Sequence, residues 1–267
     1  MLGRVNVFQK LIRDNLSGSS TILRMTIDWM LISLKEGVTG ESILNDLQSV
    51  CRHHPSMALI QNLYRSVGAL SLNEERIHAW METYRQHEAE ACGHFARHLS
   101  NMKTVLVHSN SSLLFSSLQL VTTPLTVFCT ESRPAFEGRL LAEALSRTHH
   151  TVYLISDMAA FSVLPRVDIL AFGCDSITDH GIVNKIGTAP LTQSSRVHGK
   201  QNYFVATSEK WLPLWDDSLL ERQGPPQEIY HGSLPVHSEN YYFDLTRPGE
   251  IDGIFWETGL QTGLYPC

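Results

Sequence analysis

Apolar residues recur at helical spacing through the first hundred residues of the chain. One series covers Ile22–Leu34. A longer series begins after Asn73, a residue type suited to capping a helix, and continues to Leu99. Two shorter helical patterns lie between them. Because no strand pattern occurs before Lys103, the sequence predicts a helical domain over residues 1–102.

From Lys103 onward, short apolar runs alternate with helical patterns. This alternation is typical of a mostly parallel sheet whose strands are joined by crossover helices, so the expected fold class is α/β. Pro248 is predicted to open a final helix that contains Ile254, Phe255 and Trp256. The predicted strands are Thr104–Val107, Leu125–Cys129, Thr151–Ile155, Val167–Phe172 and Asn202–Ala206.

Polar or charged residues follow these strands at the points where the strands end. Ser109 follows the first strand, Arg133 the second, Asp157 the third and Asp175 the fourth. In an open parallel sheet, ligands bind in the crevice outside the carboxyl ends of the strands. The sequence therefore predicts one shared binding site at this edge of the sheet.

A glycine-containing phrase, Gly181–Thr188, precedes the predicted helix Ala189–Val197. Glycines let backbone amides approach an anion, and the start of a helix favours negative charge. Lys185, Arg133 and Arg139 add cations, so this cluster predicts a receptor for a phosphate group. An alternative role for Arg133 is a structural salt bridge to a nearby carboxylate: Glu131, Asp157 or Asp175.

The composition limits the class of protein. A net charge of −6 over 267 residues, with no run of lysine and arginine, argues against direct binding of nucleic acid. No apolar stretch approaches the roughly 20 residues of a membrane span, and the first ten residues lack the layout of a signal peptide. Five cysteines, without CxxC spacing, fit a reducing cytoplasm.

The longest predicted helix carries His87, Glu90, His94 and His98 on one face. Imidazole and carboxylate groups can bind zinc, so a metal site is conceivable there. The favoured interpretation is a polar stripe that faces solvent or another subunit. No metal and no other cofactor is expected.

Several phrases occur in a fixed order along the second half of the chain: Thr130–Pro134, Glu137-Gly138-Arg139, Gly173-Cys174-Asp175 and Asn184–Thr188. Together they resemble one family, which unites the alpha, beta and delta regulatory subunits of translation initiation factor two B with methylthioribose-1-phosphate isomerase and ribose-1,5-bisphosphate isomerase. The resemblance implies a helical N-terminal domain. It also implies that residues 103–267 form a Rossmann-like domain for ligand binding and dimerisation.

The isomerases of this family convert an aldose 1-phosphate to a ketose 1-phosphate, with a Cys and an Asp for proton transfer. By motif, Asp175 matches that Asp, and Asn184 and Lys185 match the Asn-Lys pair that holds the substrate. Ser109 stands in the place of the Cys. A serine hydroxyl is a much weaker acid than a thiol, and losing a general acid costs roughly 10²–10⁴-fold in rate. The family's early Arg-Gly-Ala phrase is replaced by Ser17–Ser20.

These observations favour a sugar-phosphate isomerase-like protein that binds a phosphorylated pentose, with weakened or altered catalysis. If active, it is an intramolecular oxidoreductase. Asp175 and Ser109 are its candidate catalytic residues, with His108 or Cys174 as substitutes for proton transfer. The candidate substrate-binding residues are Asn184, Lys185, Arg133, Gly187, Thr188 and Arg139.

The alternative is a non-catalytic regulatory subunit that senses a phosphorylated sugar or nucleotide, because regulatory subunits of the exchange factor typically lack the Cys. A homodimer is expected, and a translation-factor partner fits this alternative. A scaffold with a vestigial pocket is the third interpretation.

Overall fold

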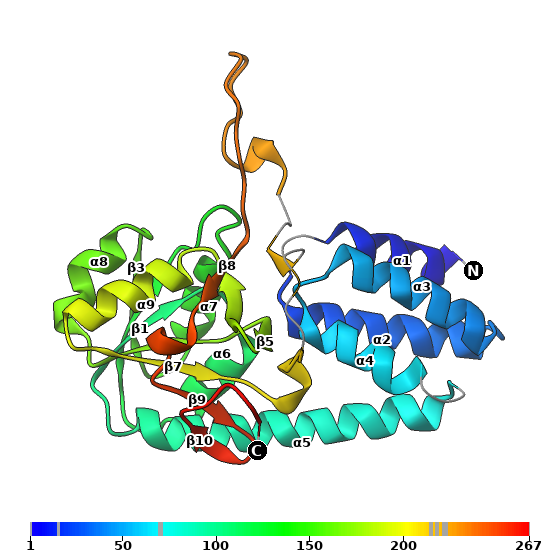
Figure 1. Ribbon diagram of the computed structural model, residues 1–267, viewed down its shortest axis with the longest axis horizontal. Helices are drawn as coiled ribbons and strands as arrows, with labels where there is room; N and C mark the ends of the chain where they lie inside the picture. Colours follow the sequence, from blue (N-terminus) through cyan, green and yellow to red (C-terminus); the bar gives the residue numbers. More distant parts are fainter. Residues whose placement is uncertain are drawn as a thin grey trace.

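The protein is described by a computed structural model, which covers residues 2–14, 17–68, 72–213, 216, 219–220 and 224–266. Figure 1 shows a helical part and an α/β part side by side. The long helix α5, Glu74–Leu99, runs along both of them. Within the described ranges, no helix combines the length and the apolar character that crossing a bilayer would require.

The helical part contains one helix more than the sequence patterns indicated. Helix α1 covers Leu2–Arg13 and packs on α2 and α3. Side-chain caps begin two of the helices, since Thr39 accepts from the amide of Ser42 and Asn73 accepts from the amide of Arg76. The remaining helices of this part are α2 Ser19–Lys35, α3 Gly40–His53 and α4 Ala58–Gly68.

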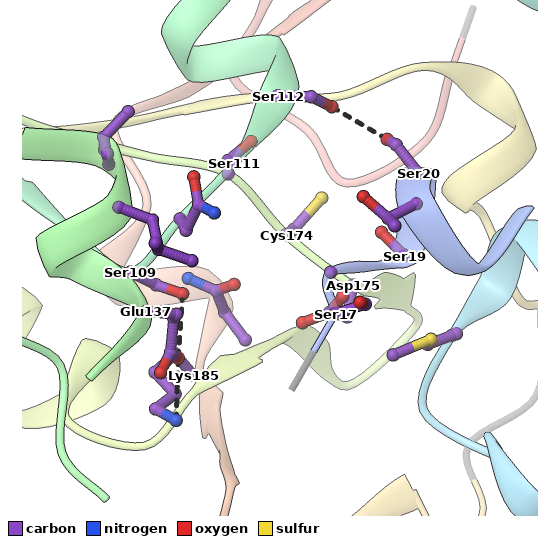
Figure 2. Close-up of a pocket in the computed structure, with 18 of the residues that line it drawn as sticks. Ser17, Ser19, Ser20, Ser109, Ser111, Ser112, Glu137, Cys174, Asp175 and Lys185 are labelled. Atoms are coloured by element: carbon purple, nitrogen blue, oxygen red, sulfur yellow. Dashed lines mark hydrogen bonds and ion pairs between the residues drawn. The ribbon is translucent and has the colours of Figure 1, made fainter. Parts of the chain in front are cut away.

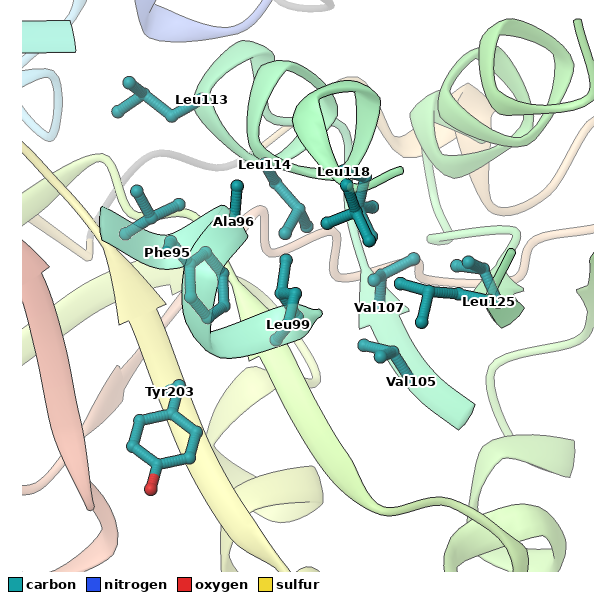
Figure 3. Close-up of a cluster of buried hydrophobic side chains, with 14 of the residues drawn as sticks. Phe95, Ala96, Leu99, Val105, Val107, Leu113, Leu114, Leu118, Leu125 and Tyr203 are labelled. Atoms are coloured by element: carbon teal, nitrogen blue, oxygen red, sulfur yellow. The ribbon is translucent and has the colours of Figure 1, made fainter. Parts of the chain in front are cut away.

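Helix α5 belongs to two hydrophobic cores, that of the helical part and that on one face of the main sheet. Ile77 and Met81, in its first half, pack with α1 to α4. Phe95 and Leu99, in its second half, pack against the sheet and helix α6, Ser112–Leu120, as Figure 3 shows. A single helix therefore joins the two parts and holds them against one another.

The main sheet has seven strands in the order β10-β9-β7-β4-β1-β2-β3. All neighbouring pairs are parallel except β10 with β9. This is the strand order of a doubly wound Rossmann fold, with one antiparallel strand added at the edge. The predicted α/β class is confirmed. The strands are β1 Thr104–His108, β2 Thr126–Thr130, β3 Thr151–Ile155, β4 Ile169–Phe172, β7 Gln201–Val205, β9 Gly253–Trp256 and β10 Gly259–Gln261.

Helices cover both faces of this sheet, so its central strands are buried on both sides. All four residues of β4 are buried. One face packs on α5, α6 and α7, and the other contributes Phe172, Phe204 and Trp256 to a separate core. The remaining helical segments are α7 Glu137–Leu145, α8 Ala159–Val163, α9 Thr188–Val197, η1 Leu164–Arg166, η2 Ser208–Lys210, η4 Pro226–Glu228 and η5 Pro248–Glu250.

The predicted helix after Pro248 is wrong. Pro248 opens only a single 3-10 turn, and the apolar residues that follow form β9, which lies beside β7 inside the core. Periodicity cannot separate a short buried strand from a buried helix, because both are continuous apolar runs.

A small antiparallel sheet lies beside the main one, and the sequence patterns did not indicate its first two strands. It contains β5 Ser176–Thr178, β6 Gly181–Lys185 and β8 Phe243–Thr246 in the order β5-β6-β8. Residues 224–241, which precede β8 in the chain, project from the body as an arm (Figure 1).

Candidate functional site

A cavity of about 320 Å³ lies at the carboxyl ends of β1 and β4. These two strands are neighbours, although the chain leaves β1 towards one edge of the sheet and returns through β4 towards the other. Such a switch point is where doubly wound folds bind ligands. Four segments supply most of the polar wall: Ser17–Ser20, Ser109–Ser112, Gly173–Asp175 and Asn184-Lys185.

The ends of β1 and β4 approach each other closely beside the cavity. Ser109 adopts a left-handed backbone conformation, with φ of 71°, which turns the chain sharply after β1. Ser111 then caps α6 by accepting from the amide of Leu114. A Cβ on Gly173 would lie 2.3 Å from the Ser111 hydroxyl oxygen, so glycine is required there.

The first turns of α2 and α6 meet at the cavity. The Ser112 hydroxyl donates to the Ser20 hydroxyl at 2.9 Å and ties the two helix starts together, as Figure 2 shows. The first amides of a helix have no acceptor within the helix, and they attract anions. Arg24, whose Nε donates to the Ser20 carbonyl, also lines the cavity. This side of the cavity is suited to a phosphate group.

A buried ion pair lies on the other side of the cavity in Figure 2. Lys185 Nζ is 2.7 Å from Glu137 Oε1, and the two side chains are only 6% and 13% exposed. The Ser109 hydroxyl donates to the same oxygen at 3.4 Å. Burial raises the pKa of the Glu137 carboxyl, against the lowering effect of Lys185. The cavity therefore contains a carboxylate that is held in one orientation by its neighbours.

Glu137 was not among the residues selected from the sequence, although it begins the Glu137-Gly138-Arg139 phrase. The neighbouring Gly138 is the feature of the sequence that could have identified it. A Cβ on Gly138 would lie 2.0 Å from the carbonyl oxygen of Thr130, so α7 starts directly against the end of β2. This close approach brings Glu137 into the cavity wall.

The predicted site residues divide into two groups. Ser109, Asp175, Asn184 and Lys185 line the cavity together. The other four, Arg133, Arg139, Gly187 and Thr188, are not part of its wall.

Arg133 and Arg139 make structural contacts around Phe136. The Arg133 guanidinium donates to the carbonyl of Glu228 and lies 4.6 Å from the centre of the Phe136 ring. Arg139 pairs with Glu131 at 2.7 Å, and its guanidinium lies 3.9 Å from the centre of the same Phe136 ring. Both arginines therefore stabilise the segment after β2 and do not line the cavity.

The backbone amides of Ser132 and Arg133 donate to the Asp157 carboxylate, each at 2.7 Å. The carboxylate thus binds the main chain of the segment after β2. The alternative role considered for Arg133 was a salt bridge from its guanidinium to Glu131, Asp157 or Asp175. The structure instead shows the guanidinium donating to the Glu228 carbonyl, while the backbone binds Asp157.

Gly187 and Thr188 lie at the start of α9, where a carboxylate of the protein occupies the anion position. The amide of Gly187 donates to Asp244 at 2.7 Å, and the amide of Ala189 donates to it at 3.2 Å. Burial raises the pKa of Asp244 to about 7. The Thr188 hydroxyl accepts from the side-chain amide of Asn184, so it positions a cavity residue from behind.

His108 and Cys174, considered as substitutes for proton transfer, are both constrained. His108 Nε2 lies 2.9 Å from the carbonyl of Ile186 and must donate to it, while Nδ1 accepts from the Thr130 hydroxyl. Burial lowers the pKa of His108, which keeps it neutral. Burial also raises the pKa of the Cys174 thiol to about 11. Neither residue is therefore suited to proton transfer near neutral pH.

The histidine stripe on α5 makes protein contacts. His87 Nδ1 lies 2.7 Å from Glu209 and 3.7 Å from Glu257, and His94 contacts Arg97. Across the part of the chain that the structure describes, no three His, Cys, Asp or Glu side chains are grouped to hold a metal ion.

Comparison with protein families agrees with this architecture. The model of the initiation factor 2 subunit family matches residues 19–263, which is most of the chain. The chain belongs to this family. The match includes both the helical part and the sheet that carries the cavity.

Curated relatives of the family carry two kinds of name. The ribose 1,5-bisphosphate isomerase of Methanocaldococcus jannaschii is 30% identical over 177 residues, which cover 62% of this chain and 56% of that protein. The chain thus spans little more than half the length of the isomerases it matches. An eIF-2B subunit 2-like protein of Pyrococcus horikoshii is 24% identical, and the match covers 96% of this chain and 95% of that protein.

Two solved structures share the whole fold. The structure of translation initiation factor eIF-2B from Pyrococcus horikoshii has a TM-score of 0.86 at 23% identity, with 96% of each chain covered. That of 5-methylthioribose 1-phosphate isomerase from the same organism has a TM-score of 0.72 at 22% identity, with 96% and 83% covered. At these identities the likeness concerns the fold.

Proposed function

We propose that this protein binds a small phosphorylated sugar in the cavity and is related in chemistry to the sugar-phosphate isomerases. One observation carries the proposal. Two helix starts, joined through Ser20 and Ser112, face the same cavity as Asp175, Asn184 and Lys185. The helix starts suit a phosphate, and the three polar side chains suit the hydroxyl groups of a sugar.

Aldose-ketose isomerisation requires a group that protonates the ring oxygen and a group that assists transfer between C1 and C2. Asp175 is the candidate for proton transfer, and Asn184 and Lys185 can hold the sugar oxygens. Ser109 retains a hydroxyl where the family isomerases have a thiol. A positioned general acid contributes roughly 10²–10⁴-fold to the rate, so turnover is expected to be slower by that factor than in an isomerase that has the thiol.

A second candidate function is a non-catalytic sensor of a phosphorylated sugar or nucleotide. Among the described residues that line the cavity, the one cysteine is Cys174, and its pKa is raised to about 11, which favours this function. The match over 95% of the eIF-2B subunit 2-like protein, against 56% of the isomerase, also favours it. A translation factor is the corresponding protein partner.

A homodimer formed through the α/β part accompanies either function. The edge strand β3 supports it, because Tyr153 and Leu154 are each 50% exposed there and Met158, just after the strand, is 76% exposed. Apolar side chains gathered at an open sheet edge favour association.

Thermal melting in the presence of ligands tests the binding proposal. Ribose 1,5-bisphosphate, methylthioribose 1-phosphate and AMP would be added separately at increasing concentration. A ligand at 100 times its Kd stabilises the folded state by about 2.7 kcal/mol, which raises Tm by roughly 5–10 °C for a chain of this size. If none of the three raises Tm at millimolar concentration, the proposed function fails.

Product analysis separates the two candidate functions. Wild type and Asp175→Asn would be incubated with each sugar phosphate that binds, and the ketose product quantified. Slow turnover that is lost in Asp175→Asn supports the isomerase. Binding without turnover, together with a copurifying translation factor, supports the sensor. Turnover that survives Asp175→Asn unchanged would remove Asp175 from the mechanism.

A further inference from the structure

The two sides of the cavity differ in their charge. The joined starts of α2 and α6 present helix amides, hydroxyls and Arg24, which all favour an anion. On the other side, Glu137 lies 2.7 Å from Lys185 and neutralises it. Figure 2 shows this pair well separated from the contact between Ser20 and Ser112.

Without Glu137, Lys185 would be a second receptor for phosphate, because a buried lysine is a strong point charge. With Glu137 in place, a phosphate bound to Lys185 would also lie beside a carboxylate. The cavity wall also contains a second carboxylate, Asp175, and a second buried lysine, Lys210, whose Nζ donates to the Cys174 carbonyl at 2.6 Å. Because the opposite charges of Lys185 and Glu137 lie 2.7 Å apart, the attraction of Lys185 for a second phosphate is largely cancelled by the repulsion from Glu137.

An uncharged hydroxyl group meets the opposite situation. Glu137 Oε2 is buried and has no hydrogen-bond partner among the residues that the structure describes. Because protein atoms cover Oε2, a ligand in the cavity would contact this pair at Lys185 Nζ and Glu137 Oε1. A sugar hydroxyl can donate to the carboxylate and accept from Lys185, whereas a phosphate dianion has no proton to donate. The ion pair thus favours a hydroxyl over a phosphate.

We infer that Glu137 is a specificity-determining residue, which restricts the cavity to ligands with a single phosphate and an uncharged, hydroxylated remainder. This inference rests on the proposed function, because it assumes that the side formed by the helix starts holds a phosphate. It separates this protein's ligand from a sugar 1,5-bisphosphate.

Isothermal titration at pH 8 with ribose 1-phosphate and ribose 1,5-bisphosphate tests the inference, since the two ligands differ by one phosphate. The wild type should bind ribose 1-phosphate at least tenfold more tightly. Glu137→Gln keeps the size of the side chain and removes its charge, so it should reverse the preference. Glu143→Gln, an exposed substitution on the same helix, should leave the preference unchanged.

Each other result has a definite meaning. If the wild type binds the bisphosphate as tightly as the monophosphate or more tightly, the inference is overturned while the proposed function stands. If Glu137→Gln keeps the wild-type preference, Glu137 is not its cause. If neither ligand binds, the proposed function fails and the inference with it. Should Glu137→Gln not fold, the comparison of the two ligands on the wild type still decides.

Discussion

Replacing Lys185 with methionine measures how strongly the fold depends on the ion pair in the cavity. Lys185 and Glu137 are 6% and 13% exposed, so the substitution leaves a carboxylate buried without its cation. Removing one partner of a buried pair typically destabilises a protein by about 3–5 kcal/mol. The methionine fills most of the lysine's volume, which keeps the packing loss small.

The magnitude can be worked out from the ionisation of Glu137. A carboxyl with an ordinary pKa of 4.5 that must stay protonated in the fold at pH 7 costs 1.36 kcal/mol per pH unit, or about 3.4 kcal/mol. At pH 5 the same cost is only about 0.7 kcal/mol. A carboxyl whose pKa is raised in the fold contributes stability that is lost as the pH rises. The loss in Lys185→Met should therefore grow from pH 5 to pH 7.

Urea unfolding of four proteins at both pH values provides the measurement: wild type, Lys185→Met, Glu137→Gln and the double variant. The double variant has no buried charge left to neutralise, so it should regain most of the stability lost in Lys185→Met at pH 7. A loss in Lys185→Met that is equal at both pH values, or that the second substitution does not relieve, would refute this reasoning.

Three further predictions concern the surroundings of the cavity. Burial raises the pKa of Asp244 to about 7, so the wild type should lose stability as the pH rises from about 4 to about 7, and Asp244→Asn should flatten this dependence in chemical unfolding at pH 5 and pH 8. Gly173→Ala places a methyl group 2.3 Å from the Ser111 hydroxyl and should lower the free energy of unfolding by about 1–3 kcal/mol. Gly249→Ala is the control, because a Cβ at that position has no other atom within 4 Å, and chemical unfolding of both variants provides the measurement. Arg139→Ala removes an ion pair outside the cavity, so the rise in Tm caused by a bound sugar phosphate should stay as in the wild type; a lost rise would restore Arg139 to the site.

Part of the candidate site follows from rules that operate on the sequence alone. Ser109 follows β1 directly and Asp175 lies three residues beyond the end of β4, and the carboxyl ends of neighbouring parallel strands lie side by side. Their presence in one cavity is a consequence of strand order. Asn184 and Lys185 reach the same cavity from β6, a strand that the sequence patterns did not indicate.

The arginines illustrate what a local pattern misses. Arg133 and Arg139 are near a strand end in sequence, but a long side chain can point in several directions. Phe136 and Glu131 offer contacts that hold these guanidinium groups away from the cavity. Gly187 shows the same limit of a local pattern. Its backbone amide, expected to bind a phosphate, donates to the Asp244 carboxylate, which lies 57 residues further along the chain.

The sequence by itself determined the fold class and the sheet edge at which the cavity lies, because hydrophobic periodicity and strand ends are local properties. It did not determine that Trp256 lies in a strand, that α5 joins two of the cores, or that Glu137 faces Lys185. Each of these depends on which segments pack together. Burial, ion pairing and pKa belong to such long-range contacts, so only the tertiary structure decided them.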